Sequence, residues 1–504
     1  MIAYTERTEQ TATYSRGGDG NDPDNTDAGF RAEPLNNQPF SALYRRYRTA
    51  ALLLVTGVMM LLSFLWYVPG ANHTKTMGEY HVYTFSEFRF NNVIAMYVNH
   101  NLDQFSGPRF ILNGNGIEYP PLLSMLIRAT AGVGVVKDVP LDVYRSGTPV
   151  PSTPQDKKAG NAVAYTWLNY AANFFFGLLF ILLLANWPGA RPWLFALSPL
   201  LFLFAGYNWD IIPIAISLAG VFLLRQSILR PDPGRDYNRW LEIAGYAALA
   251  VGIWFKLFPV VFLAGVLVQR ARQKQWKAIG LGLGVVAALT LIINVPVALA
   301  NFDSWYFFLW MHQNRPTELS IWYWLLGGMD PATAGRPDVT ATINLLSLLL
   351  VGSGGLLLTF FAWKSPRRDI VMPLAAALLV WWLTFNKVYD PNFDIWVLFV
   401  LVALGVPTWL YMTFTLVSLN WWLVTFIGLH LALEKNTEAI NAWFLSHASF
   451  LTLMLRLASL AVLIVWSTRE LLRPETETEE EYQIAPARVT APAAAPSTAL
   501  QQGA

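Results

Sequence analysis

The sequence predicts an all-α protein that crosses a membrane about 12 times. Of its 504 residues, 54% are hydrophobic and only 13% are charged, which is too apolar for a soluble domain of this length. The apolar residues form successive runs of helix length, with short basic clusters between them. The 21 Trp, 20 Tyr and 31 Phe can supply aromatic belts at both membrane interfaces.

The composition also excludes several kinds of site. The chain has no Cys, which rules out disulfides, zinc thiolate sites and cysteine nucleophiles. No two of its six His stand at a metal-ligand spacing such as HxxxH, so we expect no metal. There is no GxGxxG or Walker-type loop, and the net charge of +2 indicates nothing about partners. We therefore expect no cofactor and no nucleic-acid partner.

Two polar tails enclose the predicted membrane domain, which runs over 45–473. Residues 1–44 are rich in Thr, Asn, Asp and Gly, and no apolar core follows the first Met, so they predict a disordered cytoplasmic tail and not a cleavable signal. Arginines at 45–48 then precede the apolar run 50–69, which predicts a first span with its N-terminus in the cytoplasm. Residues 474–504, acidic and then Ala/Pro-rich, predict a second disordered cytoplasmic tail.

A long, comparatively polar segment over 70–160 follows the first span and is expected outside. Residues 86–102 can form an amphipathic helix. The prolines of Glu118-Tyr119-Pro120-Pro121 suit the first turn of a second helix, over 118–136. This helix either lies shallow or re-entrant at the outer surface, or it spans. If it spans, the short helices around Asp210 must be recounted and the Arg191 loop moves outside.

The remaining apolar runs complete the count. With the helix over 118–136 left outside, every basic cluster lies in the cytoplasm, and so do both termini. The predicted spans are 50–69, 162–186, 192–207, 211–224, 240–254, 257–268, 278–300, 342–363, 370–385, 395–411, 412–433 and 451–466.

The segment 301–324 is predicted to be an external loop at the membrane surface. It is crowded with aromatic residues, which favour the boundary between headgroups and hydrocarbon. His312, Arg315 and Glu318 stand among them. A protonatable group and a fixed cation there could hold an anionic group carried by a lipid. Alternatively, the segment is an aromatic anchor whose charges face water.

This topology gathers unusual polar residues at the external helix ends. Asp210 and Lys256 stand out, because each lies between apolar runs at a depth where a charge is costly without a partner or a purpose. They form either an ion pair between helices or part of an outward-opening cavity for a phosphate and a hydroxyl. The whole group is Glu87, His100, Asp103, Glu118, Trp209, Asp210, Lys256, His312, Arg315, Asn386, Lys387 and Asp390.

Five short motifs, within about residues 85 to 400, make the sequence resemble a known family. Their order is that of the GT-C membrane glycosyltransferases, specifically the actinobacterial-type branch of glycosyltransferase family 87, which holds polyprenol-phosphate-mannose-dependent mannosyltransferases and relatives. The motifs are Glu118-Tyr119-Pro120-Pro121-Leu122, Asn208-Trp209-Asp210, Lys256-Leu257-Phe258-Pro259, Asn314-Arg315 with Ser320-Ile321-Trp322-Tyr323, and Asn386-Lys387-Val388 with Pro391.

The resemblance implies a GT-C fold with a large first external loop and an active site on the outer face of the plasma membrane. The donor would be a sugar, mannose by family analogy, on a polyprenyl phosphate, and the acceptor a glycan or lipid. A carboxylate base would activate the acceptor hydroxyl, and the transfer would invert the anomeric carbon. The residues expected to bind substrate are Asn92, His100, Glu118, Tyr119, Trp209, Asp210, Lys256, His312, Arg315, Trp322, Asn386 and Lys387.

The sequence departs from the family at the expected base. Asn92 stands where the family has an acidic residue ahead of a tyrosine, and an amide cannot take a proton. Glu87 and Asp103 are the nearest carboxylates and become the catalytic candidates, although each could be a solvated surface charge. The alternative function is a non-catalytic relative, a transporter or a scaffold for lipid-linked saccharides.

Overall fold

A computed structural model describes most of the chain, in two compact units, 1–47 and 48–504. Residues 1–38 and 476–504 of the predicted tails lie outside the described residues. Helix α1 begins at Pro39, which is still within the predicted N-terminal tail 1–44. The site lies wholly within the second unit. The described residues are 39–100, 102, 111–112, 116–132, 155–229, 239–318, 320–325, 336–431 and 447–475.

Every regular element of the described residues is a helix, and the one β pairing among them is an isolated parallel bridge between Glu318 and Val388. Within these residues, seven helices are long and apolar enough to cross a membrane. The predicted all-α membrane class is therefore confirmed. These helices belong to α1 (Pro39–Tyr67), α7 (Gln155–Ala185), α10 (Ile211–Ile228), α13 (Trp276–Ala300), α17 (Pro337–Lys364), α20 (Thr408–Leu431) and α22 (Ser449–Leu472).

Four shorter helices pack among the long ones. Helix α19 is buried along its whole length, so it lies at the centre of the core. Helices α10 and α11 approach closely because both carry glycine: a Cβ on Gly220 would lie 2.9 Å from the carbonyl oxygen of Gly245. The shorter helices are α11 (Arg239–Phe255), α12 (Val260–Arg272), α18 (Val371–Phe385) and α19 (Asp394–Ala403).

Two predicted spans are interrupted. The run 192–207 forms α8 (Pro192–Ala196) and α9 (Pro199–Phe204) instead of one helix. Pro199 has no N–H, and the Ser198 hydroxyl caps the new helix by accepting from the Leu200 N–H at 3.2 Å. The run 395–411 ends at Ala403, where Gly405 takes a φ of +68°. The count of 12 spans thus stays a prediction.

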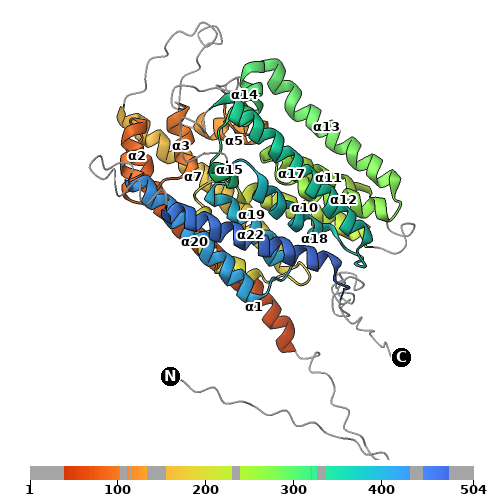
Figure 1. The fold of residues 1–504 in the computed structure, drawn as a ribbon. Helices are drawn as coiled ribbons and strands as arrows, with labels where there is room; N and C mark the ends of the chain where they lie inside the picture. Colours follow the sequence, from red (N-terminus) through yellow and green to blue (C-terminus); the bar gives the residue numbers. More distant parts are fainter. Residues whose placement is uncertain are drawn as a thin grey trace, which may run out of the picture. The chain divides into compact units, whose positions relative to one another are not determined.

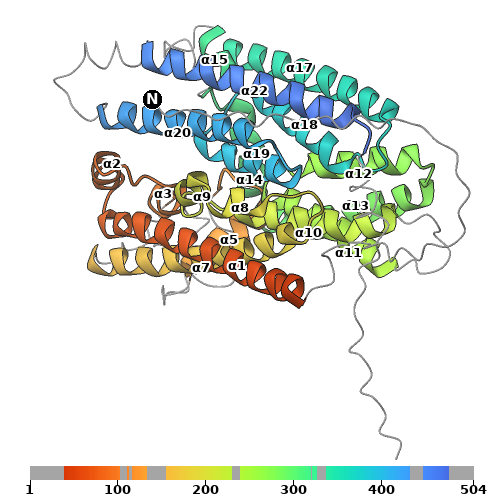
Figure 2. The same cartoon turned by 90° about the horizontal axis from the view of Figure 1, so that it is seen from below.

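Short helices gather at one end of the bundle, where Figures 1 and 2 both place α2 and α3, and where Figure 1 also places α14. The run 118–136 yields a helix of 12 residues, shorter than the ~20 needed to span. The short helices are α2 (Met77–Ser86), α3 (Asn92–Asn99), α5 (Pro121–Gly132) and α14 (Phe302–Asn314). Of these, α3 and α14 supply residues that line the cavity described below.

The prediction that 301–324 is a loop is wrong. Residues 302–314 form α14 and residues Ile321–Leu325 form α15. The Asn301 side chain caps α14 by accepting from the Ser304 N–H at 3.1 Å, and Asp303 lies in its first turn. The helix ends at Asn314, two residues before Pro316, because a proline disfavours helical backbone in front of it.

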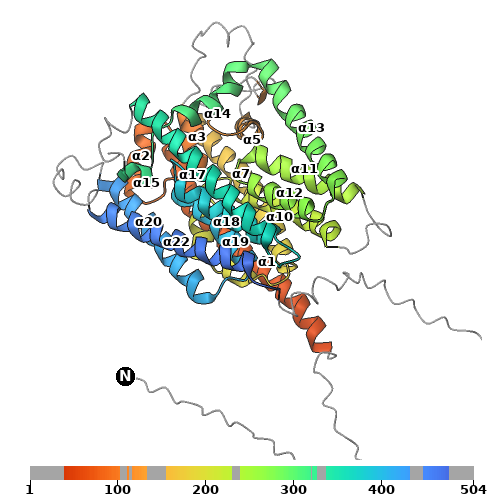
Figure 3. The same ribbon diagram turned by 45° about the vertical axis from the view of Figure 1, so that its right-hand side comes forward.

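The outer faces of α13 and α17 are apolar and exposed. Only 11% of the α13 window and 17% of the α17 window are buried within the protein. Leu299 and Leu356 are 83% and 75% exposed. Figure 3 shows α13 at the edge of the bundle. Such faces suit contact with lipid chains, because exposed apolar surface of this extent is unfavourable in water.

Candidate functional site

A cavity of about 590 Å³ lies where α10 and α19 begin and α18 ends. This volume is within the range of small-molecule sites. Aromatic side chains make much of its wall and charged groups face it from four segments of the chain. The charged and polar groups are Asn92, Glu118, Asn208, Lys256, His312, Arg315, Glu318, Asn386, Lys387, Asp390 and Thr425, and the aromatic ones include Phe90, Tyr119, Tyr207, Phe258, Phe308, Trp382, Phe393 and Trp396.

A buried ion pair lies beside the cavity. Asp210 is 0% exposed and accepts a hydrogen bond from Lys256, which precedes α12. Its other oxygen accepts from Asn392 Nδ2 at 2.6 Å. The Lys256 ammonium also lies 5.4 Å from the ring centroid of Tyr119 and 5.5 Å from that of Trp396. The pair therefore joins three segments, while Lys256 still lines the cavity.

A second charged group lies at the cavity wall. Arg315 binds Glu318 through two nitrogens, one of them Nε at 3.0 Å, and lies 3.9 Å from Asp390. The backbone explains this arrangement. The Glu318 N–H donates to the Lys387 carbonyl and the Tyr389 N–H donates to the Glu318 carbonyl, both at 3.1 Å. This pairing positions Arg315 against the segment after α18.

Two further basic side chains line the same region. Lys387 Nζ donates to the Gln313 carbonyl at 3.2 Å. Desolvation lowers the pKa of Lys387 to about 8, and the nearby Arg315 contributes to this shift. The pKa of His312 is also lowered, by desolvation first and then by the neighbouring cations. His312 is therefore mostly neutral at pH 7, whereas Lys387 keeps its charge at pH 7 and loses it as the pH passes about 8.

Glu118 is the least constrained carboxylate of the cavity. Among the described residues it has no hydrogen-bond or ion-pair partner, whereas Glu318 and Asp390 both face Arg315. Desolvation raises the pKa of Glu118, although Arg315 opposes the shift. A partly buried, unpaired carboxylate with a raised pKa is able to accept a proton from a bound hydroxyl.

Eight of the predicted substrate-binding residues share this cavity, and others lie behind it. Trp209 is buried, donates from Nε1 to Asn169 at 2.7 Å, and packs edge-on against Tyr119 at 5.6 Å. Trp322 donates to the Phe385 carbonyl at 2.8 Å. The eight that line it are Asn92, Glu118, Tyr119, Lys256, His312, Arg315, Asn386 and Lys387.

Neither of the two predicted catalytic residues, Glu87 and Asp103, is found among the described residues that line the cavity. Glu87 is exposed at the end of α2 and lines a separate surface hollow with His73 and Glu79. His100, at the end of α3, does not line the cavity either. Asp103 lies outside the described residues.

Comparison with known proteins gives little. No protein-family model matches this chain, and no curated protein matches it. One solved structure is similar: ArnT from Cupriavidus metallidurans bound to undecaprenyl phosphate, with 14% sequence identity, 84% of this chain and 78% of that chain covered, and a TM-score of 0.37. The residues of the cavity, and not this similarity, are the basis of the function proposed below.

Proposed function

We propose that this protein is a membrane glycosyltransferase of the GT-C type, which moves a sugar from a polyprenyl-phosphate donor to an acceptor hydroxyl. The observation that supports this most is one cavity with three kinds of surface. It has aromatic walls for a sugar and a prenyl chain, three cations for a phosphate, and an unpaired carboxylate for a hydroxyl. The cations are Lys256, Arg315 and Lys387.

The cations would act on the leaving group. As the bond from the anomeric carbon to the phosphate oxygen breaks, negative charge grows on the polyprenyl phosphate, and preorganised donors lower the barrier most at such a point. Arg315 has a planar fork whose geometry matches a phosphate, so a donor phosphate would compete with Glu318 for it, and Lys387 offers a compact charge. Lys256 is the more buried cation, and its bond to Asp210 holds it in place.

Glu118 would act as the general base. The acceptor oxygen forms a bond to the anomeric carbon, its proton passes to the Glu118 carboxylate, and polyprenyl phosphate leaves from the opposite face with inversion. Glu118 would thus supply the general base that the amide of Asn92 cannot provide. Glu118 is preferred to Glu87 because Glu118 lines the cavity and Glu87 does not. Asp103 remains a second candidate on sequence grounds alone.

The finer assignments rest on the five sequence motifs. Mannose as the sugar, and a glycan or lipid as the acceptor, follow by analogy with the family that these motifs resemble. The distribution of charge supports the orientation. Arg225, Arg270 and Arg367 lie at or near the helix ends opposite those that bound the cavity. By the positive-inside rule, this supports a cavity that faces outward from the plasma membrane and termini in the cytoplasm.

Binding of polyprenyl phosphate, the expected product, tests the phosphate site directly. Arg315→Gln is expected to weaken its binding to the purified protein about 10- to 100-fold, because a charge-assisted hydrogen bond is lost. Arg336→Gln is the matched control, since Arg336 is exposed and pairs only with nearby Asp338 among the described residues. Equal affinity in the two variants would remove Arg315 from the phosphate site.

The raised pKa of Glu118 and the lowered pKa of Lys387 together predict a bell-shaped pH profile of kcat/KM, a parameter that reports the ionisation of the free enzyme. The base acts when deprotonated, so the rate rises with pH as Glu118 loses its proton, above the ordinary range of a glutamate. The cation acts when protonated, so the rate falls as pH passes about 8, the pKa of Lys387. Lys387→Arg keeps a charge throughout and is expected to abolish the alkaline limb. A limb that persists near pH 8 in that variant would contradict the assignment.

A further inference from the structure

A second pocket, of about 200 Å³, lies far from the cavity and carries an unusual amount of charge. Helix α10 begins beside the cavity, directly after Asp210, and Arg225, near its other end, lines this pocket. Fifteen helical residues separate the two, or about 22 Å along the axis. The charged residues of the pocket are Arg191, Arg225, Arg367, Arg473, Asp369 and Glu470.

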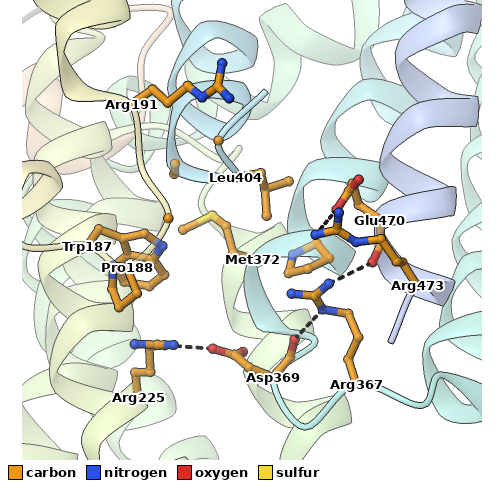
Figure 4. A pocket seen from close by; sticks show the side chains of 14 residues that line it. Trp187, Pro188, Arg191, Arg225, Arg367, Asp369, Met372, Leu404, Glu470 and Arg473 are labelled. Carbon is orange, nitrogen blue, oxygen red and sulfur yellow. Dashed lines mark hydrogen bonds and ion pairs between the residues drawn. The ribbon is translucent and has the colours of Figure 1, made fainter. Parts of the chain in front are cut away.

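Ion pairs and hydrogen bonds fix most of these charged side chains. Arg225 Nε lies 2.7 Å from Asp369, and Arg473 lies 3.2 Å from Glu470. Arg367 Nη1 and Nε lie 3.4 Å from the carbonyl oxygens of Glu470 and Asp369 respectively. Figure 4 shows these groups around Met372 and Leu404, with Arg191 on a further side.

The balance of charge within the lining is positive. Four guanidinium groups face two carboxylates, which leaves a net charge of +2. Arg191 is exposed and donates to the hydroxyl of Thr408 at 3.2 Å, which leaves its charge unneutralised by that contact. Just outside the lining, Glu475 accepts from the Asp369 N–H, and Arg272 donates to the Arg367 carbonyl, so the immediate surroundings add both signs.

The wall of the pocket is preformed. Gly189 and Gly405 have φ values of +76° and +68°, which favour glycine. A Cβ on Gly405 would lie 2.5 Å from the Gly189 carbonyl oxygen, so the two loops are in close contact. The Arg191 N–H donates to the Val402 carbonyl at 3.0 Å and joins the same loops. The arginines therefore surround a space whose backbone is fixed.

We propose that this pocket binds a phosphate-bearing anion, either a lipid headgroup or free phosphate. The planar fork of arginine suits phosphate, and a net positive, preformed pocket reduces the cost of binding it. The volume is below the ~300–1,000 Å³ of sites for drug-sized ligands, so it fits a phosphate and not a lipid-linked sugar. This inference does not depend on the proposed transferase activity.

The test compares two double variants of the full-length protein at constant ionic strength. Arg191→Gln/Arg473→Gln removes two exposed cations of the pocket. Arg239→Gln/Arg368→Gln removes two exposed arginines outside it and serves as the control. One arm titrates inorganic phosphate into protein in detergent. The other compares thermal unfolding in nanodiscs of phosphatidylglycerol and of phosphatidylcholine.

The pocket variant is expected to lose about tenfold or more in phosphate affinity, or most of the stabilisation by phosphatidylglycerol, while the control keeps either effect. A response to inorganic phosphate identifies free phosphate as a source, and a response to phosphatidylglycerol alone identifies a headgroup. Equal losses in the two variants, or a wild type that responds in neither arm, overturn the proposal. If the double variant unfolds in phosphatidylcholine, Arg191→Gln alone gives the same comparison.

Discussion

Glu118→Gln is expected to lower kcat for sugar transfer by about 10²- to 10⁴-fold, the usual contribution of a positioned general base. Glutamine keeps the shape of the side chain but cannot take the proton of the acceptor hydroxyl. Donor binding should change little, because the cations of the cavity stay in place. The measurement is single-turnover transfer from a labelled polyprenyl-phosphate sugar, with donor affinity measured in parallel.

Glu87→Gln is the matched control. It makes the same chemical change at an exposed carboxylate that does not line the cavity, and it should leave turnover near the wild-type value. If Glu118→Gln retains its rate and Glu87→Gln loses it, Glu118 is not the base, and Glu87 must approach the substrate in a state that differs from this structure. If both retain activity, Asp103→Asn becomes the next variant to measure.

Lys256→Met is expected to lower the free energy of unfolding by about 3–5 kcal/mol, the usual cost of leaving one partner of a buried ion pair without its counter-ion. Asp210 is 0% exposed and would keep only the hydrogen bond from Asn392 among those the structure describes. Methionine fills a similar volume, so the loss measures charge more than packing. Denaturant unfolding of the ligand-free protein measures it.

A double variant separates charge from shape. Lys256→Met with Asp210→Asn removes both charges and should recover part of the lost stability, because no uncompensated charge then stays buried. Arg336→Met breaks an ion pair that is exposed to solvent and should change the unfolding free energy hardly at all. A Lys256→Met protein as stable as Arg336→Met would show that the buried pair contributes nothing to the fold.

The long helices could be predicted from the sequence, whereas the short ones were harder. Apolar runs such as 278–300 and 342–363 are long enough to identify a span by themselves, and α13 and α17 occupy them. The run 192–207 is also largely apolar, yet Ser198 and Pro199 start a new helix within it. In the segment 301–324, the many aromatic side chains suggested a loop at the membrane surface, although α14 forms there. Asn301, a capping residue, and Asp303, in the first turn, could have indicated where this helix starts.

The site could be predicted only in part, for a similar reason. Charged residues between apolar runs attract attention, and Lys256, Arg315 and Lys387 do meet in one cavity. Trp382 and Trp396 also line it, but on apolar helices nothing in the sequence distinguishes them from core residues. The preference for Glu118 over Glu87 depends on how α2 and the segment before α5 pack against the ends of the long helices. The local sequence pattern does not specify this packing.

The most direct test of the account is turnover by the purified wild-type protein in detergent, with polyprenyl-phosphate-mannose and a panel of other polyprenyl-phosphate sugars. The account predicts transfer of the labelled sugar to an acceptor with inverted anomeric configuration, and release of one polyprenyl phosphate for each sugar transferred. No transfer from any of these donors, with polyprenyl phosphate still bound in the cavity, would contradict it and favour a transporter or scaffold for lipid-linked saccharides.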